Sequence, residues 1–90
     1  MDKTNDKNKT VVEIAGIKYP LRGVQDVEMI QEAAKMVDEK IKLITKSSRY
    51  LPPDRIAVLA GLHLAEQYLE LRKDYEEFWH ILNENSSDTK

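Results

Sequence analysis

The sequence predicts a mostly helical α+β fold: an N-terminal β-hairpin packed on an amphipathic helix, then a long C-terminal helix that forms a coiled coil with another subunit. Three observations predict it. Apolar and polar residues alternate with the two-residue period of strands only before Gly23. The three-to-four-residue spacing of helices fills two later runs, 26–47 and 53–82. The second run carries a single apolar seam over its outer half, which has nothing in its own short chain to pack against.

Residues 10–22 are predicted to form the hairpin, as two short strands around Ala15 and Gly16. Apolar side chains alternate with polar or Pro positions on both sides of this turn, and Gly16 supplies the positive φ that a tight hairpin turn requires. Pro20 cannot donate a ladder hydrogen bond, so either the second strand lies at a sheet edge or that position is left unpaired. Since a lone two-stranded hairpin is marginal in water, it must lie on the helices or join the hairpin of another subunit.

Residues 26–47 are predicted to form an amphipathic helix. Asp26 is suited to cap its N-terminus, because a short carboxylate can accept hydrogen bonds from the free N–H groups of the first turn. Most other positions are charged or polar, so one stripe is buried. Its members recur at spacings of 3, 4, 3, 4 and 3: Val27, Ile30, Ala34, Val37, Ile41 and Ile44.

Residues 53–82 are predicted to form one long helix. Pro53 suits the first helical turn, where its missing N–H is not needed, and Asp54 favourably meets the positive end of the helix dipole. Up to Leu69 nearly every face is apolar, so 53–69 complete a globular head that spans 10–69. The helix would be about 45 Å long, against a head of roughly 25 Å. Residues 70–82 are therefore expected to project from the head.

A single seam runs along the outer part of this helix and is predicted to be the oligomer interface. Its spacings of 4, 3, 4, 3 and 4 are those of a coiled coil. The seam consists of Leu64, Tyr68, Leu71, Tyr75, Phe78 and Leu82.

The size of the chain also favours association. Ninety residues form one small domain, and such domains commonly need disulfides, a metal or a partner subunit. The chain has no Cys, and His63 and His80 are too few for a closed metal site, so oligomerisation remains. The polar segments 1–9 and 83–90 lack the apolar residues that would order them, and we expect both to be disordered tails.

Charge and hydropathy exclude several functions. A net charge of −2 without a basic recognition helix argues against nucleic acid, including a small DNA-binding regulator. No run approaches a membrane span, and the polar N-terminus is unlike a signal peptide, so we expect a cytoplasmic protein. The carboxylate pairs lie on charged helices beside Lys and Arg, which is typical of solvated faces, and there is no phosphate-binding loop. We therefore expect no enzyme activity, no cofactor and no metal.

Two features have alternative interpretations. The aromatic residues Tyr68, Tyr75, Phe78 and Trp79 could form a stacking platform, but three of the four fall on the seam, and their acidic surroundings disfavour nucleic acid. Small residues run along the first half of the long helix, which fits either close packing on the first helix or a close crossing at a dimer axis. They are Ala57, Ala60, Gly61 and Ala65.

Three basic residues lie in the hairpin segment and the inter-helix loop: Lys18, Arg22 and Arg49. Such charges usually only solubilise a surface. They become a docking patch where the partner is strongly acidic, because steering depends on local charge and not on net charge.

The order and the amino-acid sequences of three segments resemble the ZapA family of bacterial cell-division proteins, over Val11 to about Arg72. The segments are the hairpin Val12-Glu13-Ile14-Ala15-Gly16-Ile17-Lys18-Tyr19, the helical Val37-Asp38-Glu39-Lys40-Ile41, and the run Arg55-Ile56-Ala57-Val58-Leu59-Ala60-Gly61-Leu62-His63-Leu64-Ala65-Glu66. Their specificity lies in their combination and order.

The resemblance implies a small non-enzymatic protein, without a cofactor, that binds the tubulin-like division protein FtsZ at midcell. ZapA-like proteins cross-link FtsZ protofilaments and promote Z-ring assembly, and they act as homodimers, often joined into homotetramers through the long helix. On this interpretation Lys18, Arg22 and Arg49 contact FtsZ. The alternative, which needs the same head and seam, is a generic homodimeric coiled-coil adaptor of another cytoplasmic complex. The sequence leaves open whether the protein is a dimer or a tetramer, and whether the paired helices run parallel or antiparallel.

Overall fold

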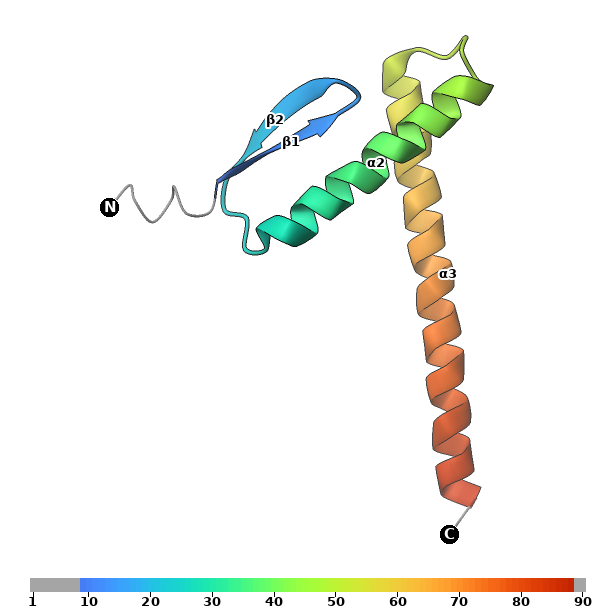
Figure 1. Ribbon diagram of the computed structural model, residues 1–90. Helices are drawn as coiled ribbons and strands as arrows, with labels where there is room; N and C mark the ends of the chain where they lie inside the picture. The colour runs from blue at the N-terminus through green and yellow to red at the C-terminus, as the bar shows by residue number, and fades with distance from the viewer. Residues whose placement is uncertain (1–8, 89–90) are drawn as a thin grey trace, which may run out of the picture. The chain divides into compact units, whose positions relative to one another are not determined.

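The computed structural model describes residues 9–88 and confirms the predicted fold class (Figure 1). A two-stranded antiparallel sheet is followed by two helices, and the chain divides into two compact units, one ending at Ala60 and the other beginning at Gly61. The elements are β1 (Thr10–Ile14), β2 (Ile17–Leu21), α2 (Val27–Ser47) and α3 (Pro53–Asp88).

The hairpin closes at the two residues where the sequence predicted a turn. Ile14 pairs with Ile17, and both residues between them have positive φ, 55° at Ala15 and 80° at Gly16. This is the left-handed geometry that matches the twist of a hairpin, and it suits Gly better than Ala. The conformation costs Ala15 roughly 1–2 kcal/mol, which the strand pairing and a side-chain contact to its N–H offset. Pro20 lies opposite Val11 in this two-stranded sheet, in which both strands are edges.

Capping sets both ends of α2 close to their predicted positions. The Asp26 carboxylate accepts a hydrogen bond of 3.0 Å from the Met29 N–H, as expected of an N-cap. At the other end the Ser48 N–H donates to the Ile44 carbonyl at 2.8 Å, after which the chain turns toward α3. The cap is Asp26, and α2 runs from Val27 to Ser47, within a residue of the range 26–47 expected from the sequence.

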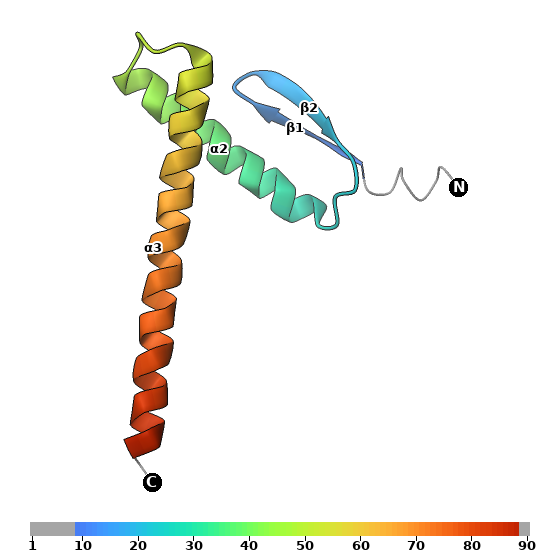
Figure 2. The same cartoon turned by 180° about the vertical axis from the view of Figure 1, so that it is seen from behind.

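The hairpin lies beside α2, with β1 as the nearer strand (Figure 1 and Figure 2). Val12 from β1 is 3% exposed and Ala34 from α2 is 7% exposed, while the first turns of α3 bury Ile56 and Ala60. These four make up the buried hydrophobic set of the described residues, and two of them are alanines. A core this small provides little hydrophobic stabilisation for a domain of this length.

α3 begins at Pro53, as the sequence predicted, and continues past Leu82 to Asp88. Residues 83–88, which the sequence placed in a polar tail, therefore continue the helix. Each residue added to an existing helix gains a hydrogen bond without a new nucleation step, so a polar segment can extend a helix that is already formed. The rest of the two predicted tails, 1–8 and 89–90, lies outside the described residues.

Candidate functional site

A wide apolar groove lies in the unit that ends at Ala60. Its volume is about 1020 Å³. The hairpin forms one wall and α2 the floor, and residues of the connection to α3 and of the first turn of that helix complete the lining. The principal apolar residues of the lining are Val12, Ile14, Ile17, Tyr19, Leu21, Ile30, Ala33, Ala34, Val37, Ile41, Leu51, Ile56 and Ala57.

Several large side chains of this groove are exposed in the single chain. Ile17 is 55% exposed and Tyr19 is 42% exposed, although both lie on the apolar side of β2. The polar side chains of the lining are few: Thr45, Arg49 and Asp54. The rest of the lining is apolar, so an occupant of the groove would bury mainly apolar surface. A helix with its side chains is about 10–12 Å across, so the groove suits an apolar protein segment better than a polar ligand.

Two side chains of α2 hold the hairpin over this groove. The Gln31 amide Nε2 donates to the Thr10 hydroxyl and to the Val11 carbonyl, each at 2.9 Å. Two helical turns later, the Asp38 carboxylate accepts a 2.8 Å hydrogen bond from the N–H of Ala15. Both contacts are to β1 or to the turn that follows it, so they fix the strand at its two ends.

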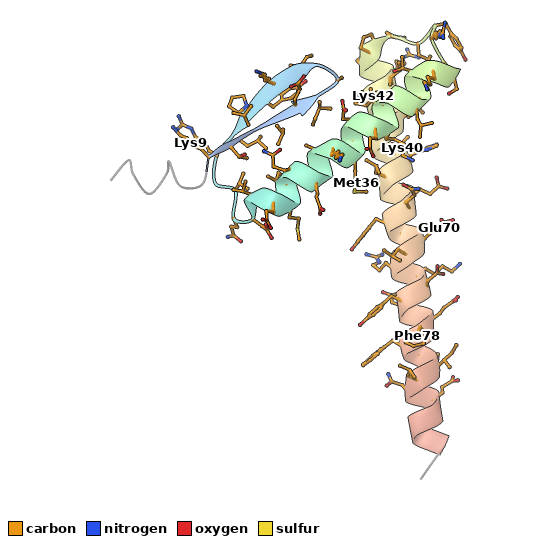
Figure 3. The ribbon with its side chains drawn as sticks, in the orientation of Figure 1. Lys9, Met36, Lys40, Lys42, Glu70 and Phe78 are labelled. Carbon is orange, nitrogen blue, oxygen red and sulfur yellow. The ribbon has the colours of Figure 1, made fainter. Side chains whose placement is uncertain are left out.

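Asp38 also binds a cation on its own helix. The Lys42 ammonium lies 3.1 Å from the carboxylate of Asp38, whose side chain is only 20% exposed. Lys42 is labelled on α2 in Figure 3. The hydrogen bond from the Ala15 N–H, followed by the contact with Lys42, lowers the pKa of Asp38 below its ordinary value of 3.8. Asp38 is therefore ionised throughout the neutral range, and its contact with the turn is charge-assisted.

The lowered pKa of Asp38 predicts an acid-dependent loss of stability. Because the folded pKa lies below the unfolded value, Asp38 stabilises the fold fully above pH 3.8, and the stabilisation is lost as the pH falls through the folded pKa. We expect Asp38→Asn to lower the free energy of unfolding at pH 7 and to approach the wild type at the most acidic pH. Urea denaturation from pH 3 to 7, followed by circular dichroism at one protein concentration, measures this difference. A difference that stays constant down to pH 3 would contradict the assignment.

The predicted seam lies on the second compact unit, in the uninterrupted helix α3. The unbroken helix places its six residues along one stripe, which is what their spacing predicted. The side chains of α3 radiate from the helix along its length, with Glu70 and Phe78 labelled in Figure 3. Leu64 is half-buried, and the other members are 41% to 69% exposed: Tyr68, Leu71, Tyr75, Phe78 and Leu82.

Polar contacts near the seam lie along the helix itself. The Arg72 guanidinium stands 5.7 Å from the centre of the Tyr68 ring, a cation–π distance. The imidazole of His80 lies 3.3 Å from the Glu84 carboxylate, four residues further along. Such exposed contacts add little to the stability of the helix.

The three predicted basic residues do not lie on one face. Lys18 alternates along β2 with Ile17 and Tyr19, which line the groove, so its position faces away from the groove. Arg22, four residues after Lys18 and just past the end of β2, follows the same alternation. Arg49, in the connection between α2 and α3, belongs to the groove lining. The basic residues therefore form an outer pair on the hairpin and a separate cation at the groove.

Among the side chains that the structure describes, those of residues 9–84, no group of three or more His, Asp or Glu is placed to hold a metal ion. No helix within residues 9–88 is long and apolar enough to cross a membrane.

The groove is the feature that sequence patterns alone missed. Its walls were each predicted as apolar faces, but the sequence did not reveal that they face one another across an open space.

Comparison with known proteins identifies a consistent set of relatives. The family model for "Cell division protein ZapA" matches residues 10–87, which extends past Arg72, where the sequence resemblance ended. The cell division protein ZapA of Shouchella clausii is 32% identical over 76 residues, covering 84% of this chain and 97% of the relative. That of Bacillus pumilus is 34% identical over 70 residues, covering 78% and 82%.

Two solved structures share the arrangement. A ZapA mutant dimer from Geobacillus stearothermophilus superposes with a TM-score of 0.69 at 27% identity, covering 83% of this chain and 87% of that chain. A conserved protein of unknown function from Pseudomonas aeruginosa superposes with a TM-score of 0.71 at 23% identity, over 90% of both chains, and supports the fold alone.

Proposed function

Because the chain belongs to the ZapA family of cell division proteins, we propose that it binds FtsZ as a non-enzymatic dimer, cross-links FtsZ protofilaments and promotes Z-ring assembly at midcell in the cytoplasm. The observation that carries this proposal is the combination of an open apolar groove with an exposed apolar seam. A chain that has so small a core of its own and two such surfaces is built to associate.

Self-association is the first step of the proposal. The seam on α3 packs as a coiled coil against the α3 helix of a second copy, and the groove binds an apolar segment of that copy. Both surfaces would bury apolar side chains that the single chain exposes, which supplies the stabilisation that its small core lacks. The related ZapA mutant structure is a dimer, which supports self-association. Pairing of two such dimers into a homotetramer would extend the same seam.

Bridging follows from the symmetry of a dimer. Two copies present two identical FtsZ-binding surfaces, held at a fixed separation by the paired helices. Each contact can be weak, because a filament offers many sites and a bivalent ligand binds a second site at high effective concentration. A dimer with modest affinity for one FtsZ subunit therefore aligns neighbouring filaments.

We propose that FtsZ contacts the outer pair Lys18 and Arg22 on the hairpin, and that Arg49, a separate cation in the groove lining, is a second contact. All three are exposed, and their charge suits an acidic partner. Reversal of the three charges to Glu is expected to reduce co-sedimentation with FtsZ filaments by about tenfold at low salt, with a smaller effect at high salt. The double variant Lys18→Glu/Arg22→Glu and the single variant Arg49→Glu show whether the hairpin or the groove cation carries the effect.

Lys35→Glu/Lys73→Glu is the matched control for the double variant. It makes the same change in net charge at exposed positions outside the hairpin and the loop. The control should sediment with FtsZ as the wild type does. Unchanged co-sedimentation of the triple variant would exclude this surface. A wild-type protein that neither sediments with FtsZ nor increases filament light scattering would overturn the FtsZ proposal and favour an adaptor of another complex.

A further inference from the structure

The contacts of Gln31 and Asp38 form a two-point attachment of the hairpin to α2, here called the clamp. Gln31 binds the beginning of β1 through Thr10 and Val11, and Asp38 binds the turn at its end through the Ala15 N–H. In a two-residue hairpin the N–H of the first turn residue has no partner within the ladder. Asp38 therefore satisfies a backbone donor that the hairpin leaves free.

The spacing of the clamp matches the two elements that it joins. Gln31 and Asp38 are seven residues apart, so they lie on the same face of α2 and are separated by about 10.5 Å. Val11 and Ala15 are four residues apart in an extended chain, a separation of about 13 Å. Between the two attachment points Val12 and Ala34 are buried. The strand is thus fixed along the helix in one register and cannot slide or tilt without breaking a polar contact.

This register determines the shape of the groove. Hairpin side chains such as Ile17 and Tyr19 form one wall, while α2 side chains such as Val37 form the floor. The separation of wall and floor depends on where the hairpin lies on α2. The apolar contact alone leaves that position loosely defined, because one small residue, Ala34, is the buried residue of α2.

We propose that Gln31 and Asp38 are positioning residues that preform the groove for a second copy of the chain, and so set the affinity of the dimer without touching the partner. The proposal rests on the self-association proposed above. Without the clamp, the hairpin would have to be ordered when the dimer forms. The free-energy cost of that ordering would make the binding free energy less favourable and so weaken the dimer.

The experiment measures the dissociation constant of the dimer by sedimentation equilibrium over a concentration series. Asp38→Ala removes the acceptor for the Ala15 N–H and is expected to raise the dissociation constant about tenfold or more. Asp38→Asn keeps a carbonyl oxygen for that N–H and is expected to restore most of the affinity. Lys42→Met removes the cation but leaves the carboxylate on the turn, so it should stay within about threefold of the wild type.

A second variant tests the other attachment point. Gln31→Ala is expected to weaken the dimer as Asp38→Ala does, while far-ultraviolet circular dichroism at saturating concentration shows the helix content of the wild type. If Asp38→Ala does not fold, the comparison of Asp38→Asn, Gln31→Ala and wild type decides. Wild-type affinity in both Asp38→Ala and Gln31→Ala, or no rescue by Asp38→Asn, overturns the clamp. A wild-type chain that is monomeric at every concentration overturns the proposed self-association instead.

Discussion

Replacement of both Leu71 and Phe78 by Asp is expected to convert the dimer into monomers. The two positions lie seven residues apart on the seam and are 69% and 60% exposed in the single chain. A dimer would place the four introduced carboxylates in an apolar interface without partners, where each costs several kcal/mol. The dissociation constant should rise on the order of a thousandfold or more. Light scattering then gives the mass of one chain at micromolar concentration.

The matched control moves the same substitutions to another face of the same helix turns. Lys73 and His80 are also seven residues apart and lie off the seam, so Lys73→Asp/His80→Asp introduces two carboxylates at the same spacing. We expect this variant to keep the mass of the wild type. If Leu71→Asp/Phe78→Asp also keeps the mass of the wild type, the seam does not join the subunits.

Truncation of Ile56 to Ala is expected to have the largest effect on stability of any single core substitution. Ile56 is 5% exposed and also lines the groove, so it belongs both to the small core and to the groove wall. Loss of a buried aliphatic side chain of this size costs about 2–5 kcal/mol. A small domain has little reserve, and the midpoint of thermal unfolding should fall by roughly 10 °C or more.

Leu43→Ala is the control for Ile56→Ala, since it removes a side chain of the same composition from an exposed position. Leu43 lies on α2, is 63% exposed and does not line the groove. Its truncation should change the free energy of unfolding by less than about 0.5 kcal/mol. Calorimetry of both variants at one concentration makes the comparison, and equal melting temperatures would contradict the assignment of Ile56 to the core.

Much of the fold could be predicted because its signals are local. Asp26 caps α2 as its position before an apolar stripe indicated, and Pro53 begins α3 where its missing N–H is tolerated. The hairpin turn was readable from Gly16, although positive φ at Ala15 was not, since Ala has no preference for it. The end of α3 was placed too early, because polar composition predicts a tail while helix propagation depends on the helix that precedes it.

The candidate site was predicted only in part. Periodicity placed the seam on one stripe of α3, and a continuous helix suffices to make that stripe. The basic residues are different, because their grouping depends on which side of a strand each occupies. Lys18 and Arg49 are both exposed cations, yet one lies on the outer side of the hairpin and the other at the groove.

The sequence by itself determined the fold class, the family, the order and type of the elements, and the apolar seam. Each of these depends on spacing within one segment or on the order of segments. Only the tertiary structure decided that the hairpin lies in a fixed register on α2, that Gln31 and Asp38 hold it there, and that an apolar groove remains open. These contacts join residues twenty or more positions apart. Periodicity within one element carries no information about which side chain of a helix reaches which backbone group of a strand.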